Sequence, residues 1–147
     1  MQDQEIRAGD DHFRHSSYRE MILEHLFLGE LLRLLWQRGT RHAEVLKAAV
    51  DDSGYDLVIE CAGRVRYIQL KARLETGRAQ KVTVSTDLFG KPGAAVIWMF
   101  FDDDLNFAHF RLFEPDHLTD LGTLRTAKHA KANAAGVKSE RPGHRDV

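Results

Sequence analysis

Residues 54–73 constrain the fold of this chain more than any other stretch. Their sequence is GYDLVIECAGRVRYIQLKAR. Two runs within it, residues 55–61 and 65–72, are rich in Val, Ile, Leu and Tyr, which favour β-strands. Ala62 and Gly63 lie between the runs, where a two-residue turn can join antiparallel strands. The stretch therefore predicts a β-hairpin.

The two faces of this hairpin follow from its turn. A two-residue turn sets Cys61 opposite Arg64 and therefore Asp56 opposite Gln69, and opposed residues share a face. Lys71 shares that face, because side chains two apart on a strand point the same way. A four-residue loop keeps this arrangement, whereas a three-residue loop puts Asp56 on the wrong side. The other face is predicted to be apolar, with Tyr55, Leu57, Ile59, Ile68 and Leu70.

A carboxylate, an amide oxygen and an ammonium group on one patch of a hairpin indicate a particular chemistry. Carboxylate and amide oxygens are suitable ligands for a hard divalent cation. An ammonium group can stabilise the negative charge that develops on a reacting phosphate. We therefore interpret Asp56, Gln69 and Lys71 as a metal-assisted phosphodiester site.

Length and composition restrict the remaining interpretation. A chain of 147 residues with 43% hydrophobic residues is predicted to form one globular domain. No apolar run approaches the roughly 20 residues of a membrane span. The N-terminus lacks an apolar signal core, so we expect a cytoplasmic protein. Cys61 is the only cysteine, which excludes an internal disulfide and a cysteine-rich zinc site.

Charge is distributed unevenly along the chain, although the formal net charge is only −1. Residues 61–100 contain 7 Lys or Arg against 2 Asp or Glu, and residues 125–147 contain 6 against 2. One interpretation is a mosaic of solvated charges, and the other is a surface that binds phosphates. The candidate nucleic-acid-binding cations are Arg64, Arg66, Arg73, Lys128 and Lys131.

An amphipathic helix is predicted before the hairpin. Residues 1–15 lack periodicity and are expected to form a flexible arm. Ser16 or Ser17 is expected to cap the helix, with Glu20 closing a capping box, and the helix should end near Gln37. Its apolar arc comprises Leu23, Phe27, Leu28, Leu31, Leu34 and Leu35.

Glu24 lies inside this apolar arc, and Glu30 lies at its edge. A carboxylate within an apolar stripe is costly to bury unless it meets a cation or a metal ion. Two interpretations of Glu24 therefore remain open, a metal ligand or an ion pair with Arg38 or another local cation.

Further strands are predicted around the hairpin. Residues 40–50 fit a strand, a short helix or a mixture of both beside the hairpin. Residues 94–101, AAVIWMFF, form a continuous apolar run that is typical of a strand buried on both faces. After an Asp-rich turn, residues 107–113 alternate in polarity. This alternation places Phe107, His109, Arg111 and Phe113 on one face.

The order of Asp56, Gln69 and Lys71 resembles the motif of the PD-(D/E)XK nuclease superfamily, in the Mrr-like branch where Gln replaces the acid of E-x-K. The matching segments read D-S-G-Y-D-L-V and I-Q-L-K. The resemblance covers residues 18–113. It implies an α/β (α+β) fold with a restriction-endonuclease-like core, in which helices flank a central mixed sheet. It also implies a helix after the Q-x-K strand, whereas residues 74–91 indicate only a strand and a helical turn.

The resemblance implies a function, the metal-dependent hydrolysis of DNA phosphodiester bonds in restriction, repair or defence. Asp56 and Glu24 would ligate Mg²⁺ or Mn²⁺, with Glu30 as the reserve ligand on the helix. The side-chain oxygen of Gln69, or the Leu70 carbonyl, would complete the shell together with water.

Lys71 would, on the same resemblance, orient the attacking water or neutralise charge in the transition state. Gln69 in place of Glu removes one negative charge from the site, which should weaken metal binding.

The sequence pattern divides the chain into a polar arm (1–15), a nuclease-like domain (16–124) and a tail (125–147). The tail is basic and almost without large apolar residues, so it is expected to be disordered or to lie on a partner. Two other functions stay open. One is an inactive nuclease-fold domain that binds DNA or a protein. The other is an α/β interaction domain whose tail completes a homodimer.

Overall fold

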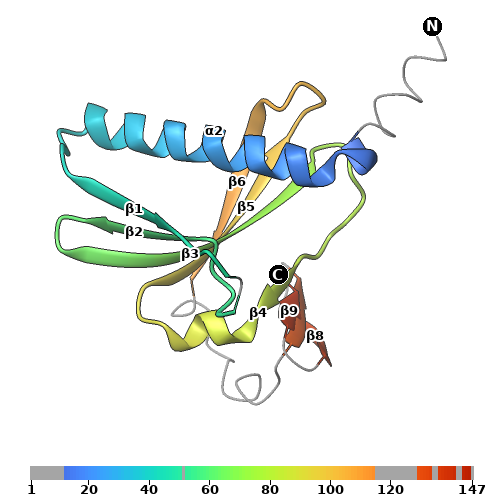
Figure 1. Ribbon diagram of the computed structural model, residues 1–147. Helices are drawn as coiled ribbons and strands as arrows, with labels where there is room; N and C mark the ends of the chain where they lie inside the picture. Colours follow the sequence, from blue (N-terminus) through green and yellow to red (C-terminus); the bar gives the residue numbers. More distant parts are fainter. Residues whose placement is uncertain (1–11, 51, 115–128, 134–135, 142–143, 147) are drawn as a thin grey trace, which may run out of the picture.

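The fold is organised around a five-stranded mixed sheet with a long helix across one face (Figure 1). The computed structural model describes residues 12–50 and 52–114, and of the tail it describes the backbone of residues 129–133, 136–141 and 144–146. The sheet order is β1-β2-β3-β5-β6. Its strands are β1 Ala43–Lys47, β2 Leu57–Cys61, β3 Arg64–Leu74, β5 Ala94–Phe101 and β6 Phe107–Phe113. The predicted α+β class with a mixed central sheet is confirmed.

β2 and β3 form the predicted hairpin in the predicted register. Ala62 and Gly63 have φ values of 51° and 74°, and a two-residue turn of type I′ needs positive φ at both positions. Cys61 is opposite Arg64, and the antiparallel pairing continues from there to the first residue of β2. β1 pairs antiparallel with β2 as an edge strand, which resolves the open assignment of residues 40–50.

β2 begins two residues later than the sequence pattern predicts, at Leu57. Tyr55 therefore does not join the apolar layer that was predicted for it. Its ring instead packs edge-to-face against Tyr67, with centroids 5.2 Å apart, in the cluster on the other side of the sheet. Tyr55 precedes β2, so the alternation of side chains along that strand does not determine the face on which its ring packs.

Helix α2, Ser16–Gln37, covers one face of the sheet. Leu23 and Phe27 are buried against the apolar side chains of the hairpin and of β5. The predicted end of the helix is confirmed, but the predicted capping box is wrong. His15 is the N-cap residue and residues 12–14 are already helical, so the Arg19 N–H bonds to the His15 carbonyl at 2.9 Å.

β5 is the central strand and is parallel to β3, with β6 antiparallel on its other side. Seven of its eight residues are buried, as the continuous apolar run predicted. The alternation predicted for β6 is wrong at one residue. A β-bulge beside Phe100 and Phe101 sets Phe107 opposite Phe101, on the α2 side, whereas Phe113 packs on the other side.

Asp102 holds the turn between β5 and β6. Its Oδ1 atom accepts hydrogen bonds from the Asp104 and Asn106 N–H groups, each at 2.9 Å. These bonds, chiefly those from Asn106, hold the pKa of the Asp102 carboxyl below its ordinary value. The ionised carboxylate therefore favours the turn at neutral pH, and the contribution is lost as acid protonates it.

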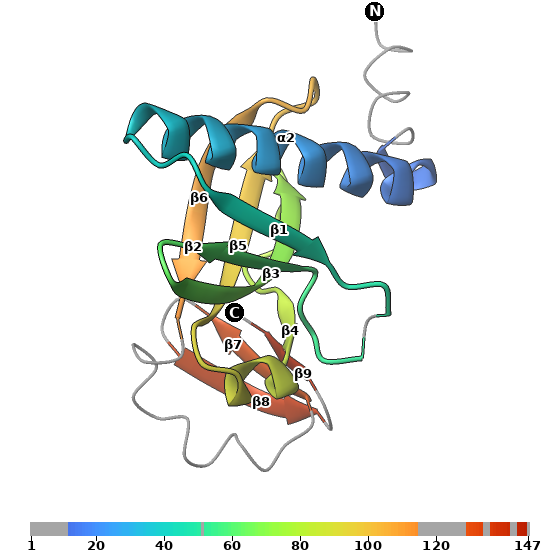
Figure 2. The ribbon, with the colours of Figure 1, turned by 60° about the vertical axis from the view of Figure 1, so that its left-hand side comes forward.

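The far side of the sheet carries a 3₁₀-helix, η1 (Thr86–Gly90), in place of the α-helix that the resemblance implied. It follows a short strand, β4 (Thr83–Ser85), below the central sheet (Figure 2). Three strands of the basic tail, β7 His129–Asn133, β8 Gly136–Arg141 and β9 His144–Asp146, complete a small second sheet with β4. Backbone hydrogen bonds hold these tail strands to β4, and such bonds need no apolar side chains. The division of the chain into arm, nuclease-like domain and basic tail stays a prediction.

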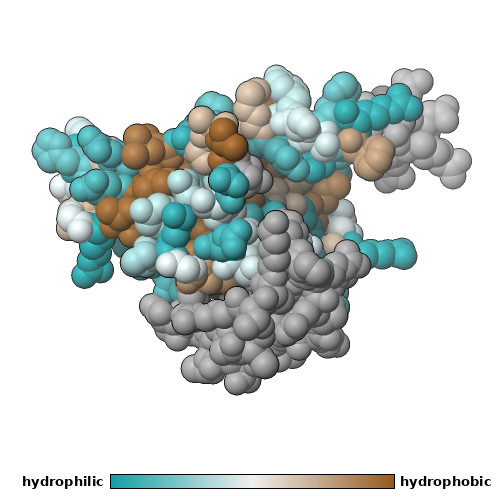
Figure 3. Space-filling view, turned by 60° about the horizontal axis from the view of Figure 1, so that its bottom comes forward, coloured by the Kyte–Doolittle hydropathy of each residue, from teal (hydrophilic) through white to brown (hydrophobic). Residues whose placement is uncertain are grey.

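Several large apolar side chains stay exposed. In Figure 3 they gather on the left-hand side, where Figure 1 places the end of α2 and the edge of the sheet. On α2 the exposed residues include Leu26, Leu32, Leu34 and Trp36. No helix within the described residues is long and apolar enough to span a membrane. The cytoplasmic location stays a prediction.

The contact between Gly54 and Ser85 gives a test of this fold. Gly54 has a φ of +76°, and a Cβ atom added there would lie 2.2 Å from the Ser85 Cβ. Gly54→Ala should lower the free energy of unfolding by about 2–4 kcal/mol, which combines backbone strain with a steric clash. Gly63→Ala is the matched control, since its φ is +74° and nothing lies within 4 Å. It should cost only about 1 kcal/mol.

Urea denaturation of both variants measures the difference. Adding Ser85→Gly to Gly54→Ala should recover part of the loss, because the clashing atoms are removed. Equal losses for Gly54→Ala and Gly63→Ala would contradict the packing of this loop against β4.

Candidate active site

β3 extends further than its partner β2, and this difference creates a cavity. β2 pairs with β3 only as far as Ile68, whereas β3 continues to Leu74 along β5. A cavity of about 500 Å³ lies beside the extended part of β3. Its lining combines the start of α2, the end of β1 and the extension of β3. The lining residues are Ser17, Glu20, Met21, Glu24, Lys47, Asp56, Gln69, Leu70, Lys71, Ala72 and Met99.

Asp56 lies at the point where the pairing of β2 with β3 ends. Its N–H donates to the Ile68 carbonyl at 2.9 Å, and its own carbonyl accepts from the Ala48 N–H at 3.0 Å. Its carboxylate accepts a hydrogen bond of 2.6 Å from the Leu70 N–H, through Oδ2. The Leu70 carbonyl lies on the same edge, because both backbone polar groups of a strand residue point to one side. Backbone geometry therefore fixes this carboxylate and this carbonyl together.

Gln69 is opposite Asp56 in the continued register and is buried, with 7% of its surface exposed. Its Oε1 atom accepts a hydrogen bond of 3.3 Å from the Ser85 N–H of β4. An amide oxygen has two lone pairs, so one acceptor position remains. The side chain is thus anchored to β4 while it also lines the cavity.

Lys71 is half-buried at the cavity wall, two residues beyond Gln69. Among the described residues it has no ion-pair partner, unlike Lys47 on β1. An unpaired ammonium group beside carboxylates keeps its three N–H groups available for an anion or for water.

Glu24 reaches the cavity from α2 and pairs with Lys47. The Lys47 Nζ atom lies 2.6 Å from Glu24 Oε1, and the two side chains are 54% and 20% exposed. The local cation that the sequence left open is therefore Lys47 and not Arg38. Glu30, the reserve ligand, does not line the cavity and pairs with Arg33 on the outside of the helix at 2.6 Å.

Sequence reasoning missed Lys47 and Glu20 in this cavity. Glu20 precedes Glu24 by four residues, a helical spacing that places both on one side of α2. Lys47 could be placed only through the register of β1, in which it is opposite Leu57, the residue after Asp56. The sequence of β1, an edge strand, shows no clear alternation of polarity from which this register could be predicted.

The cavity is lined by oxygen donors of the kind that Mg²⁺ or Mn²⁺ takes. Mg²⁺ keeps several waters and takes one or two carboxylates from a protein, and Asp56 and Glu24 supply two. Gln69 and the Leu70 carbonyl add neutral oxygens. Within the described residues no three of His, Cys, Asp and Glu gather as a metal site, so carboxylates alone are too few for a closed shell.

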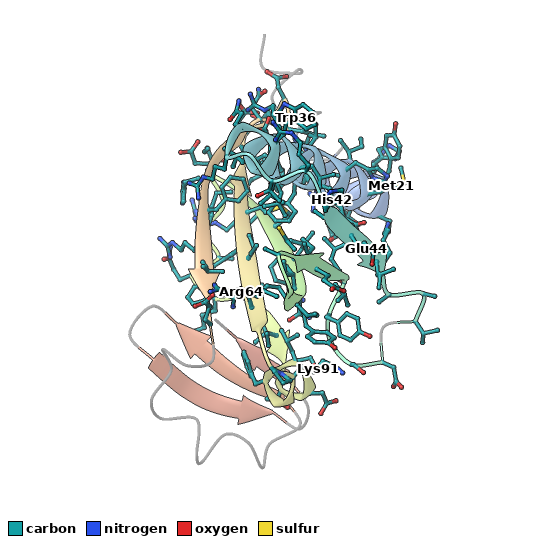
Figure 4. The ribbon with its side chains drawn as sticks, turned by 90° about the vertical axis from the view of Figure 1, so that its left-hand side faces the viewer. Met21, Trp36, His42, Glu44, Arg64 and Lys91 are labelled. Carbon is teal, nitrogen blue, oxygen red and sulfur yellow. The ribbon has the colours of Figure 1, made fainter. Side chains whose placement is uncertain are left out.

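The predicted DNA-binding cations occupy different places. Arg64 and Arg66 line a second hollow beside Gly93, and Arg66 pairs with Glu114 at 3.0 Å. Figure 4 shows Arg64 well away from Met21, which marks the cavity. Arg73 lies over the rings of β5. Lys128 falls outside the described residues, and for Lys131 only the backbone, in β7, is described.

The ion pair between Lys47 and Glu24 predicts a change in metal affinity. Lys47→Met removes a cation that competes with a metal ion for Glu24, so Mn²⁺ should bind more tightly. The gain should be at most about fivefold, because a solvent-exposed ion pair is worth up to about 1 kcal/mol. Calorimetric titration with Mn²⁺, without DNA, measures it.

Arg33→Met is the control, since it removes the other cation paired with an α2 glutamate and leaves the cavity untouched. It should not change the affinity. Weaker Mn²⁺ binding by Lys47→Met would mean that Lys47 holds Glu24 in place instead of competing for it.

The sequence and the structure can be compared with those of known proteins. No family model and no curated protein matches the sequence. The structure is similar to that of a bacterial homing endonuclease, with 20% identity and a TM-score of 0.36. The match covers 63% of this chain and 62% of that chain, so it spans less than two thirds of the endonuclease.

Proposed function

We propose that this protein is a nuclease that hydrolyses DNA phosphodiester bonds with Mg²⁺ or Mn²⁺. One observation carries the proposal. Glu24, Asp56, Gln69 and Lys71 come from a helix, a strand start and a strand extension, and all four line one cavity. Two carboxylates, an amide oxygen and an unpaired ammonium group are the components that metal-assisted phosphodiester hydrolysis requires.

A bound Mg²⁺ would supply an acidified water and a polarised phosphate. The protein's own contribution is to position the groups around it. Asp56 and the Leu70 carbonyl are held at one edge of β3 by the backbone, so this part of the site is preorganised. Lys71 projects from the same strand and can donate hydrogen bonds to a phosphate oxygen as negative charge develops there.

A second candidate is an inactive nuclease-fold domain that binds DNA or a protein. Two contacts favour it. Gln69 already accepts a bond from β4, and Lys47 already neutralises Glu24. The first contact occupies a lone pair that a cation would need, and the second offsets negative charge that would attract a cation, beyond the loss caused by Gln in place of Glu. Metal-dependent cleavage separates the two candidates.

A third candidate is a homodimeric interaction domain, and the exposed apolar residues of α2 favour it. Such residues gain most by burial against a second protein surface. This candidate predicts no steep dependence of DNA binding on salt, in contrast to the other two when the partner is DNA.

The proposal predicts that Lys71→Ala removes DNA cleavage. The loss should be at least about 100-fold, because a positioned group that stabilises transition-state charge contributes about that much or more. Stability should change by less than about 0.5 kcal/mol, as is usual for a lysine without specific contacts. The assay is plasmid nicking by purified protein with Mg²⁺, with Mn²⁺ and with EDTA.

Two variants control this experiment. Asp56→Ala should also abolish nicking, whereas Lys81→Ala, a lysine that does not line the cavity, should leave it unchanged. Equal nicking by wild type and Lys71→Ala would point to a contaminating nuclease and refute the assignment. Absence of nicking in the wild type, together with salt-dependent DNA binding, would favour the inactive DNA-binding domain.

A further inference from the structure

The sheet face that points away from α2 carries cations and aromatic rings in two rows. β3 is paired in register with β5, and β5 with β6, so one row runs across Lys71, Trp98 and Arg111 and the next across Arg73, Phe100 and His109. Both rows lie on the same face because their members alternate along each strand. We call these six residues the aromatic–cation face.

Two arginines cover the rings of this face. The Arg73 Cζ atom lies 4.9 Å from the Phe100 ring centroid, and the Arg111 Cζ atom lies 5.1 Å from it. Both are also within 6 Å of the Trp98 ring. His109 stacks on Phe100, with centroids 4.1 Å apart and an interplanar angle of 15°. Trp98 and Phe100 are themselves buried.

The three cations at the ends of these rows carry positive charge that no described acidic residue pairs with. In the described part of the chain, Lys71, Arg73 and Arg111 have no ion-pair partner, whereas Lys47 and Arg66 do. Both guanidinium groups lie beside the same ring, so they repel each other. A guanidinium group over a ring still keeps N–H groups for an anion.

Two donors in this cluster, the Trp98 Nε1 atom and the Arg73 Nε atom, are buried and have no hydrogen-bond partner among the described residues. Buried polar groups are usually hydrogen-bonded, so these two are exceptions. The three cations without an ion-pair partner in the described part of the chain indicate a ligand that is rich in negative oxygen atoms.

The dimensions of the face suit a nucleic-acid backbone. Neighbouring strands lie roughly 4.8 Å apart, so Lys71 and Arg111, which lie in one row two strands apart, are separated by roughly 10 Å. Lys71 and Arg73 are roughly 7 Å apart along β3. One strand of B-DNA presents a phosphate about every 3.4 Å of helix axis, so several consecutive phosphates can meet this face.

We infer that the aromatic–cation face binds the phosphate backbone of DNA and leads it to the cavity. Lys71 belongs to both places, since it lines the cavity and begins the first row of the face. The rings are buried and cannot stack with bases, so the contact reads the backbone and not the sequence. This inference rests on the proposed function for the role of the cavity, but DNA binding does not require cleavage.

The test measures DNA binding without metal, so that cleavage plays no part. A fluorescent duplex is titrated in EDTA over a series of salt concentrations, and anisotropy gives the dissociation constant. Arg111→Gln, a change of an exposed residue on β6, should weaken binding several-fold at low salt. The slope of log K against log salt should fall by about 0.9, the value for one lost phosphate contact.

Arg33→Gln is the matched control, because it changes the net charge equally on the outside of α2. It should leave both quantities unchanged. Arg111→Lys keeps the charge and should retain most of the salt slope, which separates lost phosphate binding from lost packing on Phe100. Thermal melting of each variant checks that it is folded.

Equal effects of Arg111→Gln and Arg33→Gln would overturn the inference, as would a wild type that does not bind the duplex at low salt. Polyglutamate that competes as well as unlabelled duplex would also overturn it, since the face would then bind any polyanion. A wild type that binds DNA through Arg111 but does not cleave with Mg²⁺ or Mn²⁺ would refute the proposed nuclease and leave this inference standing.

Discussion

The hydrogen bond from the Leu70 N–H to the Asp56 carboxylate is the interaction on which the candidate site depends. The pairing of β2 with β3 ends at Leu57 and Ile68. Beyond this point the backbone N–H groups of β3 that faced β2 need other acceptors. Asp56 satisfies one of them at 2.6 Å and is thereby fixed at the sheet edge. The same step leaves the Leu70 carbonyl facing the cavity. A structural need of the backbone therefore places two candidate oxygen ligands, the Asp56 carboxylate and the Leu70 carbonyl, at the same edge of β3.

The turn at Ala62 and Gly63 decides whether that bond can form. One residue more or less in the loop would move Asp56 to the face that packs against α2. Positive φ at both turn residues fixes the register, and the apolar side chains of Leu57 and Ile68 support it from the core side. The position of a catalytic candidate is thus determined seven residues away, by local turn chemistry.

This dependence on local chemistry explains what the sequence could predict. The hairpin register, the end of α2 and the burial of β5 follow from turn residues, periodicity and hydrophobicity within short windows. Each of these three features is determined by neighbours in the chain, and each was predicted correctly. Helical phase also placed Glu24 on the side of α2 that lines the cavity, and its role there stays a proposal.

What the sequence could not provide depends on contacts between distant segments. Lys47 meets Glu24 only because β1 pairs with β2 in one register, and Ser85 meets Gln69 only because β4 returns beneath β3. The bulge that turns Phe107 towards α2 is a property of the β5–β6 pair. The ring of Tyr55 packs against that of Tyr67, twelve residues away. Periodicity within one segment carries no information on such pairings.

The charge balance of the cavity follows from these distant contacts. Glu20, Glu24 and Asp56 bring three negative charges, and Lys47 and Lys71 bring two positive ones, so the formal net charge of the wall is −1. A Glu in place of Gln69 would make it −2. A weakly anionic wall attracts a cation less strongly than such a Glu-containing wall would, but it also repels an anion less strongly.

β3 contributes residues both to the core and to the cavity wall, because alternate residues of the strand point to opposite faces of the sheet. Ile68, Leu70 and the following even-numbered residues pack under α2 and fix the strand in the core. Gln69, Lys71 and Arg73 point the other way, from the cavity wall onto the aromatic–cation face. A rigid strand buried on one side holds these three polar groups at fixed spacing with little loss of entropy on binding. The segment of β3 that β2 leaves unpaired is therefore the part in which core packing, metal ligation and phosphate contact can be combined.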